Sequence, residues 1–128
     1  MRGSKDDDRG LDTGRIGKLA YIRSHDPDGA DKLENLLRKK DVLMTGNSYG
    51  ERMTERQFSL VFDPLLARAV ERSQILENLG SGAASVPDLS RKLGIAAHVV
   101  FDHLKELSRR DLVEVSGYEE RSALYRRK

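Results

Sequence analysis

The second half of the chain contains three segments in which hydrophobic residues recur every three or four positions. These segments cover residues 64–79, 85–93 and about 96–110, and their apolar positions are Leu66, Ala69, Val70, Leu76, Leu79, Leu89, Leu93, Val100, Leu104 and Leu107. Residues at this spacing share one face of an α-helix. The pattern therefore predicts three amphipathic helices that bury these side chains in a core.

Short signals beside these segments predict where the helices begin and end. Asp63 and Pro64 suit the N-cap and the first position of the first helix. Ser85, with Asp88 three residues later, approximates a capping box at the start of the second helix. Gly94 permits a sharp turn before the third helix, which is expected to run from about residue 96 to residue 110.

A β-hairpin is predicted to follow the third helix. Residues 111–115 contain an apolar run typical of a strand, and residues 116–120 are turn-forming types. Residues 121–127 can return as the second strand. The expected fold class of residues 63–128 is therefore mainly α with a small β component, an α+β class.

The first half of the chain has weaker patterns. Residues 1–14 are rich in glycine and aspartate, and we expect a disordered lead-in. Residues 16–23 suit a strand or a brief helix. Residues 30–40 predict an amphipathic helix with one apolar face and an N-cap at Asp28 or Asp31. That face carries Leu33, Leu36 and Leu37.

Residues 57–62 alternate between apolar and polar side chains. Phe58, Leu60 and Phe62 occupy every second position, which predicts a strand with one buried face. Residues 15–62 are therefore expected to form a short α/β extension. The domain boundary is expected near Asp63, so that residues 63–128 form a separate domain.

Composition limits the chemistry that the chain can perform. The 128 residues include no cysteine, which excludes disulfides and thiolate metal sites. No apolar run is long enough for a transmembrane helix, and we expect a cytoplasmic protein. The net charge of +2 and a pI near 9.0 are compatible with a nucleic-acid partner.

No catalytic, metal or cofactor signature is recognised in the sequence. His98 and His103 are five residues apart, so they point to different faces of a helix, and we expect no metal site. Residues 26–37 lack the ligand order of a calcium loop. Residues 46–50 lack a phosphate-loop motif and are expected to be a loop. We therefore expect neither an enzyme nor a cofactor.

From about Arg72 onward the sequence resembles the winged helix-turn-helix domain of ArsR-type prokaryotic transcriptional regulators. The matching segments are residues 75–79, 88–95, 100–107 and 112–115, together with Tyr125 and Arg126. The resemblance covers about half of the chain. It implies a helix-turn-helix followed by a β-wing, and a function as a homodimeric regulator bound to double-stranded DNA. The resemblance also implies that helices outside the helix-turn-helix form the dimer interface. The helix with Leu33, Leu36 and Leu37 is a second candidate for that surface, and packing on its own winged helix is the alternative for it.

The resemblance places the start of the third helix in the major groove. This assigns Ala97, His98, Val99, Phe101 and Asp102 to the base-reading face, although relatives usually have more polar residues there. We expect DNA contacts from Arg91, Lys92, Ala97, His98, Val99, Phe101, Lys105, Arg109, Arg110, Arg121 and Arg126.

An alternative function is an adaptor that binds protein and not DNA. Val99, Phe101 and Asp102 suit a protein interface better than a groove, and Glu119 and Glu120 oppose a phosphate backbone. The extension of residues 15–62 offers a further surface for a protein partner.

Overall fold

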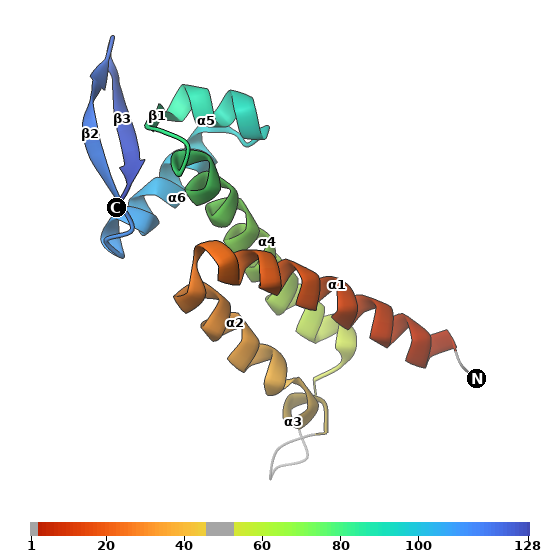
Figure 1. Cartoon of the computed structure of the whole chain (residues 1–128). Helices are drawn as coiled ribbons and strands as arrows, with labels where there is room; N and C mark the ends of the chain where they lie inside the picture. The colour runs from red at the N-terminus through yellow and green to blue at the C-terminus, as the bar shows by residue number, and fades with distance from the viewer. Residues whose placement is uncertain (1–2, 46–52) are drawn as a thin grey trace. The chain divides into compact units, whose positions relative to one another are not determined.

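The computed structural model describes the backbone of residues 3–45 and 53–128. The chain forms two compact units, Met1–Val70 and Glu71–Lys128. The helices and strands are α1 (Gly3–His25), α2 (Pro27–Arg38), α3 (Lys40–Thr45), α4 (Glu55–Leu79), β1 (Ala84–Ser85), α5 (Val86–Leu93), α6 (Ala97–Arg109), β2 (Val113–Glu119) and β3 (Ser122–Arg127) (Figure 1). The fold is mainly helical with a small antiparallel sheet, as the α+β class predicts.

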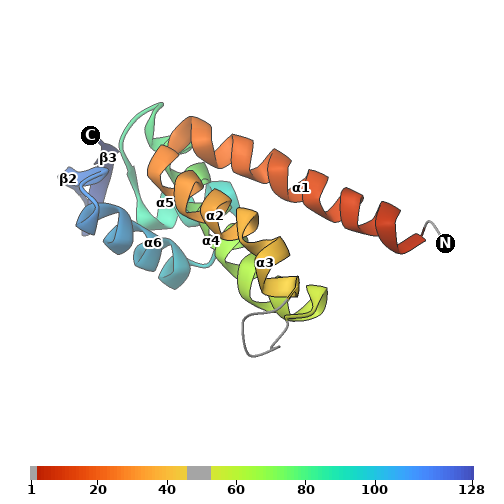
Figure 2. The same cartoon turned by 90° about the horizontal axis from the view of Figure 1, so that it is seen from below.

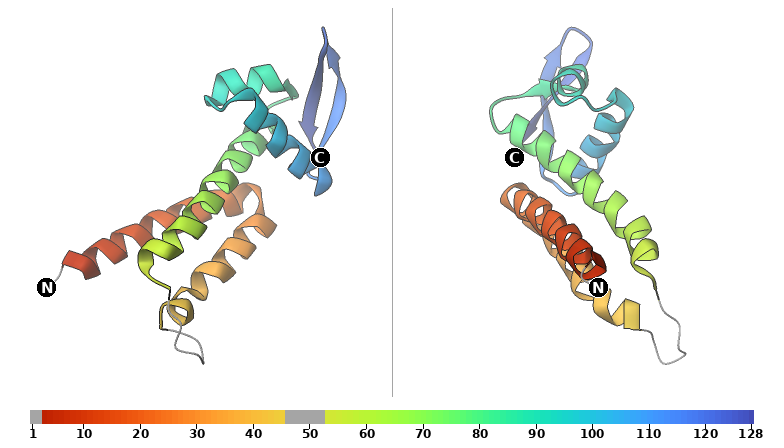
Figure 3. Two further views of the ribbon diagram at one scale, coloured as in Figure 1. Left: turned by 180° about the vertical axis from the view of Figure 1, so that it is seen from behind. Right: turned by 90° about the vertical axis from the view of Figure 1, so that its right-hand side faces the viewer.

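In the first unit, α1 and α2 reverse direction at Asp26 and lie side by side (Figure 3). Asp26, and not Asp28 or Asp31, is the N-cap of α2. Its carboxylate accepts a hydrogen bond from the Gly29 amide at 3.2 Å, and Pro27 follows as the first helical residue. The helix predicted over residues 30–40 is thus confirmed, but it begins earlier and ends at Arg38, and Lys40 begins α3.

The described part of the first unit is helical and contains no strand. Residues 16–23 lie within α1, so the helical alternative is confirmed for them. That helix begins at Gly3, so residues 3–14 are helical where we expected a disordered lead-in. The loop predicted at residues 46–50 lies outside the described residues.

The predicted strand at residues 57–62 is wrong, because these residues belong to α4. Phe58 and Phe62 are four residues apart and fully buried, whereas Leu60 is 65% exposed. The alternating pattern arises because two of its three members also fit helical spacing. They join a core of the first unit that comprises Leu19, Ile22, Ala30, Leu33, Phe58, Phe62, Leu66 and Ala69, with Leu36 and Leu37 packed against it.

The prediction that a helix begins at Asp63 is also wrong, because Pro64 lies inside α4. The helix begins after Thr54, which forms a reciprocal capping box with Gln57. The backbone N–H of Gln57 donates to Thr54 Oγ1 at 3.1 Å, and the backbone N–H of Thr54 donates to Gln57 Oε1 at 2.8 Å. Residues 63–70 belong to the first unit, and the chain divides between Val70 and Glu71 rather than near Asp63.

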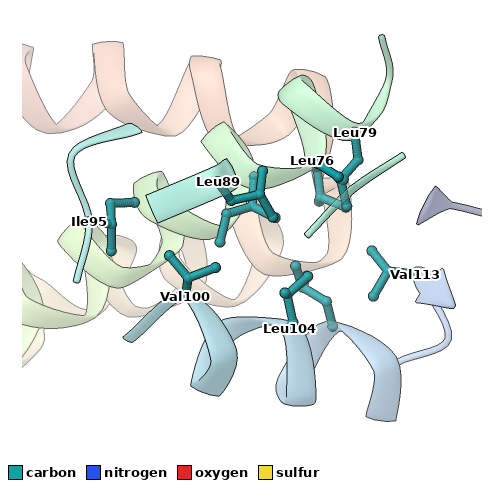
Figure 4. Packing of buried hydrophobic residues seen from close by; sticks show 10 residues of the cluster. Leu76, Leu79, Leu89, Ile95, Val100, Leu104 and Val113 are labelled. Atoms are coloured by element: carbon teal, nitrogen blue, oxygen red, sulfur yellow. The ribbon is translucent and has the colours of Figure 1, made fainter. Parts of the chain in front are cut away.

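The second unit joins the end of α4, two short helices and a three-stranded sheet. The strand order is β1-β3-β2, and both pairings are antiparallel. Its core comprises Ile75, Leu76, Leu79, Ala84, Leu89, Ile95, Val100, Leu104, Leu107 and Val113. Figure 4 shows Leu89 of α5 between the leucines of α4 and Val100 of α6. The inward positions predicted for the third helix are therefore confirmed.

The predicted signals around α5 are confirmed. Ser85 is the N-cap of α5, and its Oγ accepts a hydrogen bond from the Asp88 amide at 3.3 Å. Gly94 ends the helix with φ of 69°, a left-handed conformation that favours glycine. The turn that follows brings α6 against α5 and the end of α4 in one core.

The hairpin turn lies later than the sequence predicts. Residues 116–119 continue β2, and the turn consists of Glu120 and Arg121. A β-bulge between Val115 and Gly117 accommodates the turn-forming residues within the strand, and Glu120 adopts φ of 58° at the tip. Figure 2 shows α6 leading into this hairpin. Arg121 therefore lies at the tip and not in a strand.

Candidate nucleic-acid interface

The two faces of α6 differ sharply in exposure. Val100, Leu104 and Leu107 are fully buried and attach the helix to the core. On the opposite side, residues spaced four apart point away from the core. The exposed residues of α6 from its start to its middle are Ala97, His98, Phe101, Asp102 and Lys105. Helical spacing thus presents one outward surface, which begins with Ala97 and His98 and continues through Phe101, Asp102 and Lys105.

Two other residues of α6 do not belong to this surface. Val99 is half-buried and packs against the core of the second unit, unlike the predicted groove-facing residues beside it. His103 is buried, and its Nε2 lies 2.9 Å from Glu71 Oε1 at the start of the second unit. His103 therefore links α6 to α4.

Four of the predicted DNA-contacting cations form ion pairs. Arg91 lies 2.7 Å from Asp88, Lys105 lies 3.3 Å from Asp102, Arg109 lies 2.5 Å from Glu106, and Arg126 lies 2.5 Å from Glu114. The first three pairs join residues three apart on one helix, and the fourth joins opposite positions of β2 and β3. These carboxylates compete with phosphate for the cations.

Two carboxylates in these pairs have shifted acidities. Hydrogen bonding from Ser85, followed by that from Arg91, lowers the pKa of Asp88 below its ordinary value. The hydrogen bond from Arg109 lowers the pKa of Glu106 in the same direction. Both acids therefore keep their negative charge at neutral pH. Arg91 and Arg109 each face a permanent carboxylate.

Lys92 and Arg121 differ from these paired cations. Both side chains are exposed, and no ion pair involves either of them within residues 13–45 and 53–128. Lys92 lies in the last turn of α5, and Arg121 lies at the tip of the hairpin. They can bind an external anion without first leaving a partner.

The predicted contact residues divide between the two ends of α6. A rise of about 1.5 Å per residue places Arg109 about 18 Å from Ala97 along the helix axis. Arg110 caps the same far end, and Arg126 pairs with Glu114 near the base of the hairpin. The predicted set is therefore spread over the whole length of α6 and is not confined to its start.

A small cavity of about 200 Å³ lies beside Phe101. It is lined by the first residues of α5, by α6 and by β3, through Val86, Pro87, Phe101, Ser122, Ala123 and Tyr125. Phe101 is 43% exposed, and the Lys105 ammonium lies 5.1 Å from the centroid of its ring. No sequence pattern indicates the β3 residues of this cavity, because only the strand pairing brings them beside α5 and α6.

The structure offers no assembled metal centre within residues 13–45 and 53–128, where no three histidine or carboxylate side chains converge. None of the helices described has the length and apolar composition that a membrane crossing requires. No family model, curated protein sequence or solved structure matches this chain.

Proposed function

We propose that the second unit is a winged helix-turn-helix domain of the ArsR-like type, and that it binds duplex DNA as a transcriptional regulator. The observation that carries this proposal is the exposed surface of α6 between the end of α5 and the hairpin tip. Lys92 in α5 and Arg121 at the hairpin tip lie on the two flanking elements. Both are exposed, and neither forms an ion pair with the residues whose side chains the structure describes. The order α4-β1-α5-α6-β2-β3, with β1 paired to β3, also supports it.

In this proposal, α6 enters the major groove with its first two turns. The major groove is about 12 Å wide and admits one helix. Ala97 is too small to obstruct the approach, and His98 supplies a hydrogen-bonding side chain for base edges. Lys92 and Arg121 bind phosphates, which orients the helix but conveys no sequence information. A homodimer would present two such helices to a two-fold operator.

The ion pairs give this proposal a quantitative consequence. Arg91, Lys105, Arg109 and Arg126 are partly neutralised by carboxylates, so few phosphate contacts are expected. Affinity for duplex DNA should consequently fall with salt, but less steeply than the number of Lys and Arg residues suggests. Lys92 and Arg121 should account for much of the salt dependence.

We expect Lys92→Ala and Arg121→Ala each to weaken duplex binding and to reduce the slope of log affinity against log salt by about one. Fluorescence anisotropy with a labelled duplex across a salt series measures both effects. Lys32→Ala is the matched control, because Lys32 is an exposed lysine of α2 in the first unit. Equal slopes for all three variants, or no binding by the wild type at low salt, would contradict the proposal.

A protein adaptor is the second candidate, and one feature favours it. Phe101 is 43% exposed beside an apolar cavity, and aromatic side chains in cavities often anchor protein interfaces. The acidic pair at Glu119 and Glu120 also suits a basic protein surface. A wild-type protein without duplex affinity at low salt would favour this candidate over DNA binding.

A further inference from the structure

We infer that the Phe101 cavity is a specificity site for the 5-methyl group of thymine. This inference rests on the proposed DNA binding and adds the base chemistry that the surface selects. The cavity lies where α6, the start of α5 and β3 meet, so it opens beside the helix proposed to enter the groove. Its position distinguishes it from the phosphate-binding cations on the flanks.

The lining of the cavity favours an apolar occupant. No carboxylate, amide or cationic side chain lines it, and Ser122 and Tyr125 supply its polar side-chain atoms. A base amino or carbonyl group placed against the remaining apolar wall would lose water without gaining a hydrogen bond. The thymine methyl is the apolar group that base edges present in the major groove.

The charges around the cavity favour DNA as the source of that group. Lys105 lies over the exposed Phe101 ring, and Arg121 immediately precedes Ser122 of the cavity wall. Lys105 also pairs with Asp102 at 3.3 Å, which holds the ammonium beside the ring. The site therefore lies beside one cation without an ion pair, Arg121, and one that Asp102 partly neutralises, Lys105. An apolar site in this setting suits a methyl group carried on a polyanion.

The test compares duplexes that differ only in this methyl group. An alternating adenine–thymine duplex and its adenine–uracil counterpart are titrated by fluorescence anisotropy against the full chain. Burial of one methyl group should make the thymine duplex bind about fourfold more tightly. A guanine–cytosine duplex with and without 5-methylcytosine should show a preference in the same direction, since this methyl occupies the same edge of the groove.

Variants of the cavity separate a direct contact from a change in DNA shape. Phe101→Ala should remove the difference between thymine and uracil, and Ala123→Val, which fills the cavity from β3, should do the same. Tyr118→Ala is the control, because Tyr118 is a 75% exposed aromatic outside the cavity and should leave the difference intact. Two cavity variants on different elements keep the test decisive if one fails to fold.

The outcomes distinguish this inference from the proposed function. Duplex binding with equal affinity for thymine and uracil overturns the cavity assignment but leaves DNA binding in place. A methyl preference that survives in a folded Phe101→Ala or Ala123→Val variant also overturns it. Absence of binding to every duplex at low salt overturns both proposals.

Discussion

Replacing Phe62 by alanine is expected to lower the free energy of unfolding by about 3–5 kcal/mol, the usual cost of removing a buried phenylalanine. Phe62 is fully buried in the core of the first unit. Its ring stacks on Phe58 at a centroid distance of 5.2 Å, and the Arg15 guanidinium lies 5.3 Å from its centre. The substitution therefore removes apolar burial, an aromatic contact and a cation–π contact together.

Leu60→Ala is the matched control for this prediction. Leu60 is two residues earlier in α4 and 65% exposed, and alanine is a better helix former than leucine. Urea denaturation of the full chain, followed by far-UV circular dichroism, should show a large decrease in the free energy of unfolding for Phe62→Ala and little change for Leu60→Ala. Equal losses would instead indicate the strand arrangement, in which both side chains share the buried face.

Arg15→Met is expected to lower the free energy of unfolding by about 2 kcal/mol or more. The Arg15 side chain is only 2% exposed, yet it carries a charge. It donates hydrogen bonds to Asp63, Glu55 and Ser59, which binds α1 to α4. Breaking a fully buried ion pair costs about 3–5 kcal/mol, and the partial exposure of both carboxylates reduces that cost here.

A second cation in the network limits the loss further. Lys40 of α3 is buried and lies 2.7 Å from Glu55, so this carboxylate retains a partner after Arg15 is removed. Arg23→Met is the control, because Arg23 pairs with Asp31 and Glu34 on a more exposed surface. Removing the exposed Arg23 ion pairs should have little effect on the free energy of unfolding. If urea titration shows Arg15→Met to be as stable as Arg23→Met, the buried network does not stabilise the first unit.

Two Asp-Pro pairs show why the first unit was harder to predict. Asp26 and Pro27 begin α2, whereas Asp63 and Pro64 lie within α4. Asp26 is buried and caps a backbone amide, but Asp63 accepts a hydrogen bond from the Arg15 side chain. The local signal is the same, and the tertiary partner decides which role it takes.

One missed signal was available in the sequence. Thr54 and Gln57 have the spacing of a capping box, and they mark the true start of α4. The strand pattern of residues 57–62 begins at the last residue of that box. A helix start at this position would have assigned Phe58 and Phe62 to one helical face.

The second unit was more predictable because its signals are local and agree with one another. The cap at Ser85, the turn at Gly94 and the spacing of the apolar residues predict the same two helices. The candidate site was less predictable. An aspartate or glutamate lies three residues before each of Arg91, Lys105 and Arg109, and this helical spacing could have predicted that a carboxylate pairs with each cation. The pair of Arg126 with Glu114, and the cavity beside Phe101, depend on the hairpin register.

The most direct test of the central claim is to map amide chemical-shift changes in the ¹⁵N-labelled full chain as duplex DNA is added at low salt. The largest changes are expected at the start and middle of α6, at Lys92 and at Arg121. Changes near Arg109 at the far end of α6 should be smaller. Changes confined to the first unit, or an unaltered spectrum, would contradict the claim that the second unit binds DNA through α6.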